Sequence, residues 1–214
     1  MRNLKKIAVI PMLMLLGTGI YISTEHAAAE NNVSMKVETQ HEKLNNIDNN
    51  IKAVNTQIDE SISQKEQSIN DLQAVRVATE HGYSREVGIT IVQQAKLYDL
   101  DPSFIMGVIE TESSWTNPGA NSCGAMGLMQ VTQETGSTLA RDLGIENPDL
   151  MNPITNIKLG TYYLACLIRR YGSYDKALTA YNRGEGGLQS YMASTGTAQS
   201  DYSITVLRNQ AKYR

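Results

Sequence analysis

The sequence predicts an all-α protein, and three observations support this fold class. Apolar residues recur every three or four positions in most stretches, which is the spacing of one helix face. Residues that begin or end helices stand at the boundaries of these stretches: Asp101, Pro102, Thr132, Asn152 and Pro153 at starts, Gly144 and Gly172 at ends. No stretch makes a convincing strand, because the β-prone segment 89–92 continues the helical phase of its neighbours.

Residues 1–29 have the pattern of an export signal peptide. Arg2, Lys5 and Lys6 form a basic start, an apolar run covers 7–22, and the alanines at 27–29 fit a cleavage site. The alternative is an uncleaved anchor, but the apolar run is short for a membrane-spanning helix. We therefore expect an exported protein, either secreted or retained in the cell envelope.

Residues 30–80 are predicted to form a polar, coiled-coil-like helical spacer. No glycine or proline occurs there, and apolar residues follow one another at helical spacing: Leu44, Ile47, Ile51, Val54, Ile58, Ile62, Ile69 and Leu72. Two interpretations stay open for 40–75. It is either a surface for self-association or for an envelope partner, or a marginal helical spacer, because polar residues such as Lys65 interrupt the apolar face.

The third region, 81–214, is predicted to be one helical domain that opens at the turn 81–84. The expected helices cover 84–98, 102 through Glu112, 132–144, 153–172, 174–181, 188–194 and 198–212. A glycine-rich loop is expected at 182–187, between the fifth and sixth of these helices.

One helix of this domain carries a carboxylate on its apolar face. Glu112 lies seven, four and three positions after Ile105, Val108 and Ile109, whereas Glu110 points to another side. Burial in apolar surroundings raises the pKa of a carboxyl group, and a general acid needs such a pKa. The alternative is a paired or surface glutamate, which is the usual state of a lone glutamate in a helix.

Composition argues against several other functions. The formal net charge is −3, and no basic cluster is evident, so we expect no nucleic-acid partner. The three histidines lie outside the motif region and the two cysteines lack zinc-site spacing, so we expect no metal and no cofactor. Cys123 and Cys166 could pair in an exported protein, although we favour two free thiols.

Four stretches, in this order and spacing, carry a resemblance to a known family. They are Glu112-Ser113 with the run Gly124-Ala125-Met126-Gly127-Leu128-Met129-Gln130, then Asn156-Ile157 with Gly160 and Tyr163-Leu164, then Ala180-Tyr181-Asn182-Arg183-Gly184, and more weakly Tyr202. Together they resemble the lytic transglycosylases of the soluble-lytic (SLT), goose-lysozyme-like type, over roughly 84–210. The resemblance implies a lysozyme-like all-α domain that cleaves the glycan strands of peptidoglycan.

The resemblance also implies roles for single residues. Glu112 would protonate the β-1,4 bond between N-acetylmuramic acid and N-acetylglucosamine, and then take a proton from the muramic C6 hydroxyl, which leaves a 1,6-anhydro end. The implied substrate-binding residues are Gly127, Leu128, Met129, Gln130, Tyr181 and Asn182, with Asn121 or Ser122 as the polar neighbour of the acid. In this set Met129 would contact the sugar or simply fill the core, Gln130 would hydrogen-bond the sugar, and the Tyr181 hydroxyl would lie near the acid.

Two other functions are compatible with parts of this pattern. A hydrolytic muramidase of the same fold would need a second carboxylate placed to act with Glu112, and none is evident in the motif stretches. A non-catalytic glycan-binding or structural module would not need Glu112 at all. We therefore expect the transglycosylase.

Overall fold

The computed structural model describes residues 9–214, and side-chain surroundings are described from residue 26 onward. Helices dominate this part of the chain, which confirms the predicted all-α class. In the same residues, no helix has both the length and the hydrophobicity that a membrane crossing requires. The basic start of the predicted export signal lies outside the described residues, so residues 1–29 as a signal peptide stay a prediction.

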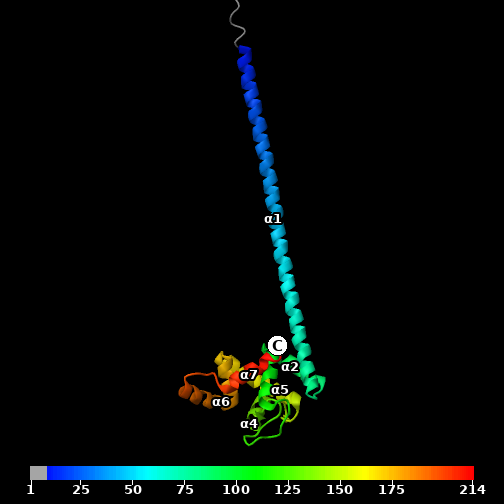
Figure 1. Ribbon diagram of the computed structural model, residues 1–214, viewed down its shortest axis with the longest axis vertical. Helices are drawn as coiled ribbons and strands as arrows, with labels where there is room; N and C mark the ends of the chain where they lie inside the picture. Colours follow the sequence, from blue (N-terminus) through cyan, green and yellow to red (C-terminus); the bar gives the residue numbers. More distant parts are fainter. Residues whose placement is uncertain (1–8) are drawn as a thin grey trace, which may run out of the picture. The chain divides into compact units, whose positions relative to one another are not determined.

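The chain divides into two compact units, residues 1–63 and 64–214. Helix α1, Val9–Glu80, forms the described part of the first unit and continues into the second. It is the long continuous helix coloured from blue to cyan-green in Figure 1. Between residues 26 and 63 every residue of α1 is exposed, including its apolar positions.

The second unit contains the remaining elements. They are α2 (Arg85–Tyr98), α3 (Pro102–Ser113), β1 (Ala125–Met126), β2 (Val131–Thr132), α4 (Gln133–Asp142), α5 (Pro153–Tyr171), α6 (Tyr174–Thr195) and α7 (Asp201–Ala211). Helix α3 packs mainly against α7, while α5 packs against α2 and α6. The short strands form one antiparallel pair, in which Ala125 faces Thr132 and Met126 faces Val131.

The predicted helix boundaries agree closely with these elements because local capping sets them. The Asp101 side chain accepts a hydrogen bond from the backbone N–H of Ser103 at the start of α3. Thr132 and Asn152 cap α4 and α5 in the same way. Gly172 ends α5 with a left-handed backbone, at φ +60°.

Two local predictions need correction. The expected loop at 182–187 is not a loop: α6 runs through it, interrupted only at Gly184, whose φ of +73° and ψ of +164° lie outside the helical region. Glycine has no Cβ and can adopt this conformation, so the chain is helical both before and after the kink. The expectation of no strand also misses the two-residue pair β1–β2, which is too short to give an alternating pattern.

The end of α1 packs as part of the second unit. Ala74, Val77 and Ala78 are buried in its core. Gly88 of α2 lies so close to this helix that an added Cβ would come within 2.4 Å of the Val75 Cα. By its contacts the compact unit begins at residue 64, whereas the turn residues predict a domain boundary at 80/81.

Close packing of α3 on α7 fixes the two helices that meet at the site. An added Cβ on Gly107 of α3 would lie 2.8 Å from the Gln210 N and 2.9 Å from the Val206 O of α7. Only glycine permits this approach of the two backbones. Side chains one to two turns away on both helices are thereby held at short separation.

Candidate active site

Glu112 is in the last turn of α3, and its carboxylate meets a side chain from α7. The Tyr202 hydroxyl donates a hydrogen bond to Glu112 Oε1 over 2.5 Å. Burial raises the pKa of the Glu112 carboxyl from 4.5 to about 7, and the Tyr202 hydrogen bond opposes this rise only in part. With a pKa near neutral pH, this carboxyl group can both donate and accept a proton.

Glu110, the other glutamate of α3, is partly exposed and has polar partners. The Tyr213 hydroxyl donates to its Oε2 over 3.2 Å, and the Lys212 ammonium lies 3.7 Å from its Oε1. The separation predicted from helical phase is therefore observed: one carboxylate is enclosed and the other is paired with a cation.

The chain leaves α3 through a strained turn. Ser114, Trp115 and Asn117 all have positive φ, which is uncommon for residues other than glycine. Trp115 anchors the turn, because its ring is buried, its carbonyl accepts from the Tyr83 hydroxyl over 2.9 Å, and its Nε1 donates to the Tyr213 hydroxyl over 3.1 Å. These contacts fix the direction in which the chain returns toward Glu112.

Ser113 connects α3 to the returning strip, residues 127–130. Its hydroxyl lies 2.9 Å from the Leu128 carbonyl oxygen and 3.0 Å from the Ile109 carbonyl oxygen, and it is buried. In the Glu-Ser motif, the glutamate supplies the carboxyl group, and the serine holds the neighbouring backbone at Leu128.

The strip itself is held by α5. Asn156 accepts from the Met129 N–H over 2.7 Å and donates to the Met126 and Leu150 carbonyls, each over 2.9 Å. Gly127 has φ of +80°, and an added Cβ would lie 2.2 Å from the Asn156 amide nitrogen. Close packing on an asparagine therefore explains the second glycine of Gly-Ala-Met-Gly, whereas at Gly124 an added Cβ would meet nothing within 4 Å.

Tyr181 of α6 bonds to the strip and not to the acid. Its hydroxyl donates to the Met129 carbonyl oxygen over 2.8 Å. Burial raises the pKa of Tyr181 well above its ordinary value, and the charge of Glu112 raises this pKa further, so the two groups lie near each other. The hydrogen bond to the Glu112 carboxylate comes from Tyr202.

Leu128 and Met129 serve the core. Both side chains are fully buried. The Met129 sulfur lies 3.6 Å from the Thr161 hydroxyl, and an added Cβ on Gly160 would come within 2.7 Å of that sulfur. Of the two roles considered for Met129, contact with the sugar and filling of the core, its full burial favours filling of the core.

The polar candidates differ in accessibility. The Gln130 amide is partly exposed and bonds to the Gly127 carbonyl over 2.9 Å and to the Asn121 amide over 3.3 Å. Asn121 also organises its own turn, since its Oδ1 accepts from the N–H groups of Cys123 and Ala125. Ser122 and Asn182 are exposed. Asn121 is therefore the one of the two alternatives, Asn121 and Ser122, that bonds to the strip.

Other carboxylates of the domain have partners of their own. Asp175 accepts from the Ser203 hydroxyl over 2.7 Å, and Glu185 accepts from Arg170 and from the Tyr171 hydroxyl. Among the described residues, none of these charges contributes to the pKa of Glu112, which burial and Tyr202 determine. In the same residues, no three His, Cys, Asp or Glu side chains cluster closely enough to hold a metal ion.

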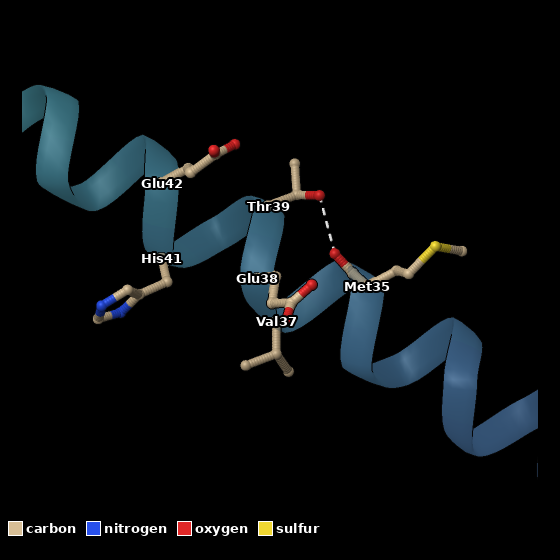
Figure 2. Close-up of a pocket in the computed structure, with 6 residues that line it drawn as sticks. All are labelled: Met35, Val37, Glu38, Thr39, His41 and Glu42. Atoms are coloured by element: carbon tan, nitrogen blue, oxygen red, sulfur yellow. Dashed lines mark hydrogen bonds between the residues drawn. The ribbon is translucent and has the colours of Figure 1, made fainter.

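A hollow lies on α1, but it is no candidate site. Figure 2 shows the six side chains that line it, from Met35 to Glu42, spreading around a single helix. One of them, Thr39, bonds only to the Met35 carbonyl of its own helix, over 2.8 Å. No opposing wall of protein encloses a ligand there.

A family model of the transglycosylase SLT domain matches residues 89–204, which is more than half of the chain. The chain belongs to the SLT transglycosylase family. The matched span runs from α2 into α7 and contains both Glu112 and Tyr202. It also contains every residue that the motif comparison assigns to the site.

Known relatives agree with this assignment. This chain is 35% identical over 120 residues to a transglycosylase of Enterobacteria phage PRD1, a match that covers 56% of this chain and 41% of the phage protein. The chain thus spans less than half the length of that relative.

Solved structures show the same fold. An inactive Glu-to-Gln variant of the lytic transglycosylase Slt from Pseudomonas aeruginosa superimposes with a TM-score of 0.52 at 26% identity, over 65% of this chain and 27% of that one. The 70 kDa soluble lytic transglycosylase from Escherichia coli gives a TM-score of 0.50 at 23% identity, over 67% and 30%. A complex of a 70-kDa soluble lytic transglycosylase with bulgecin A gives a TM-score of 0.52 at 24% identity, over 58% of this chain and 23% of that one. The predicted lysozyme-like fold is thereby confirmed.

Sequence reasoning missed the role of Tyr202. The tyrosine is visible as a weak motif match, but it lies 90 positions after Glu112 and no local pattern connects the two. The available signal is the apolar face of α7, which includes the buried Val206 and predicts that one side of this helix packs inward.

Proposed function

We propose that this SLT domain is a peptidoglycan lytic transglycosylase in which Glu112 is the catalytic acid and then the base. The enclosed carboxyl group, with its pKa near 7 and its single tyrosine donor, is the observation that carries the proposal. Family membership adds support, since the related proteins are named as transglycosylases.

Burial and the Tyr202 hydrogen bond act on Glu112 in opposite directions, and each suits one half of the reaction. Burial favours the protonated form, which can donate its proton to the oxygen of the β-1,4 bond as the bond to muramic C1 breaks. Transfer leaves a carboxylate, which the Tyr202 hydroxyl then stabilises by its hydrogen bond. The carboxylate next removes the proton of the muramic C6 hydroxyl, whose oxygen bonds to C1. Glu112 returns to its starting form and no water is consumed.

Among the described residues, no second carboxylate contributes to the pKa of Glu112, which favours this internal attack over hydrolysis. A retaining hydrolase needs a second carboxyl about 5 Å from the first, and an inverting one needs a base at about 6.5–9.5 Å. Among the described residues, Glu110, Asp175 and Glu185 are engaged elsewhere, as shown above. The tethered C6 hydroxyl has the advantage of proximity. We therefore expect 1,6-anhydromuramic ends as the product.

The accessible polar groups beside the strip are the proposed contacts to the glycan. Gln130 and Asn121 form one hydrogen-bonded pair, and Asn182 extends from α6 without burial. Amide side chains of this kind both donate to and accept from sugar hydroxyl and N-acetyl groups. Such a substrate places the protein at the cell wall, and the export signal proposed for residues 1–29 would deliver it there.

The test is lysis of isolated wall sacculi, followed by turbidity, with three proteins. The unmodified chain is expected to clear the suspension, Glu112→Gln to leave it turbid, and Glu110→Gln to act nearly as well as the unmodified chain. Glu110→Gln is the matched control because it makes the same change two residues away. An active Glu112→Gln protein would overturn the assignment of the acid.

A further inference from the structure

The exposed face of α1 carries a regular apolar stripe that no part of the described structure covers. The stripe from 33 to 62 consists of Val33, Val37, Leu44, Ile47, Ile51, Val54, Ile58 and Ile62, each about half exposed or more, from 49% at Ile58 and Ile62 to 61% at Val33. A soluble helix that exposes this many large apolar side chains along one line is typical of an interaction surface.

The spacing of the stripe identifies the kind of interaction. With Leu44 at position a of a seven-residue repeat, Val37, Ile51 and Ile58 also fall at a, while Val33, Ile47 and Val54 fall at d. This is the pattern of a coiled coil, sustained for about four repeats, which is the length usually required. The one departure is the step of four from Ile58 to Ile62, an insertion that coiled coils accommodate by local unwinding.

We propose that the stripe 33–62 binds the same stripe of further copies of this chain, parallel and in register. Gln40 supplies the first argument, since it is the one polar residue at a d position between Val33 and Ile58. In register, Gln40 faces its equivalents and their amides can bond to one another. Any shift by one repeat would place it against Val33 or Ile47, without a polar partner.

Charge supplies the second argument for parallel helices. Lys43 is at position g and Asp48 is at position e of the next repeat, and parallel helices bring such residues of neighbouring chains together. Both are exposed, and Asp48 also pairs with Lys52 of its own helix over 2.7 Å. One carboxylate has the acceptor capacity for both cations.

The branching of the side chains indicates three strands. Two-stranded parallel coils favour leucine at d, whereas β-branched residues at both a and d favour trimers. All three apolar d positions here, Val33, Ile47 and Val54, are β-branched. Figure 2 shows Val37 at position a and His41 at position e pointing to the same side of the helix, as an association face at this end requires.

The experiment measures the mass of the purified full chain by analytical ultracentrifugation over a range of concentrations. We expect a trimer that dissociates on dilution. Because the apolar run at 7–22 could associate by itself, two variants decide the cause. Ile51→Glu places a charge in the stripe and is expected to give monomers, while Asn49→Glu places the same charge on the opposite face and is expected to change nothing. Equal masses for the two variants would overturn the proposal.

Orientation is tested by charge exchange and by cross-linking. Lys43→Glu is expected to weaken association about three- to tenfold, and adding Asp48→Lys to restore it. In a chain with Cys123→Ser and Cys166→Ser, Ile51→Cys is expected to form disulfide-linked chains on mild oxidation, and Asn49→Cys is not. Failure of the charge rescue, or equal cross-linking by the two cysteine variants, would refute parallel, in-register association.

Discussion

Replacing Glu112 by glutamine is expected to remove wall lysis and at the same time to stabilise the fold at alkaline pH. Glutamine has the shape of the protonated glutamic acid but cannot ionise. The folded protein buries most of this carboxyl group and offers it a single tyrosine donor, so it accommodates the neutral form better than the charged one.

The magnitude follows from the pKa values. Below pH 4.5 the glutamate is protonated in both the folded and the unfolded chain, and it costs nothing relative to glutamine. Between pH 4.5 and about 7 the folded chain retains a proton that the unfolded chain has lost, so stability falls as pH rises. Because each unit of pKa is worth about 1.4 kcal/mol, the full cost above pH 7 is about 3 kcal/mol.

Urea unfolding at pH 4 and pH 8 measures this difference. At pH 4 the unmodified chain and Glu112→Gln are expected to have similar free energies of unfolding, whereas at pH 8 the variant is expected to be more stable by about 3 kcal/mol. Glu110→Gln is the control, and we expect no such gain because Lys212 and Tyr213 already support the charge of Glu110. A pH-independent difference for Glu112→Gln would refute the argument that burial raises its pKa.

Three further predictions concern the neighbours of the acid and the extent of the domain. Lysis is expected to decline as pH rises through about 7, because Glu112 then loses its proton. The variant Tyr202→Phe should reduce the rate about tenfold and move this decline to higher pH, because it removes the hydrogen bond that lowers the pKa of the acid. Gly127→Ala should cost about 3 kcal/mol in urea unfolding because of its positive φ and close neighbours, against about 0.5 kcal/mol for Gly119→Ala, where an added Cβ meets open space. A fragment 64–214 should fold and remain active, whereas 81–214, which lacks the buried part of α1, should be about 3 kcal/mol less stable by the same method; equal stability of the two fragments would show that α1 adds nothing to the domain.

Local chemistry explains how much of the fold can be predicted. Helix starts are fixed by the side chain of one residue, as at Asp101 and Asn152, so the sequence alone locates α3 and α5 within a residue. The position of Glu112 on an apolar face follows from helical phase in the same way. Both features depend on residues only a few positions apart.

Contacts between distant segments are what the sequence leaves out. Nothing near Tyr202 indicates that its hydroxyl meets Glu112, because that contact depends on the packing of α7 on Gly107. Likewise, the turn residues at 81–84 predict a domain boundary there, but they give no sign that α1 packs against Gly88. The motif residues Leu128 and Met129 are informative about the family even though they build the core.

The identity of the cleavage product tests the central claim most directly. Isolated peptidoglycan is incubated with the purified chain, and the soluble muropeptides are analysed by mass spectrometry before and after borohydride reduction. Internal attack by the C6 hydroxyl gives 1,6-anhydromuramic ends that are lighter by one water and resist reduction, and these are expected to dominate. Muropeptides with reducible muramic ends as the main species would contradict the account, and would assign a hydrolytic muramidase to the same carboxyl group.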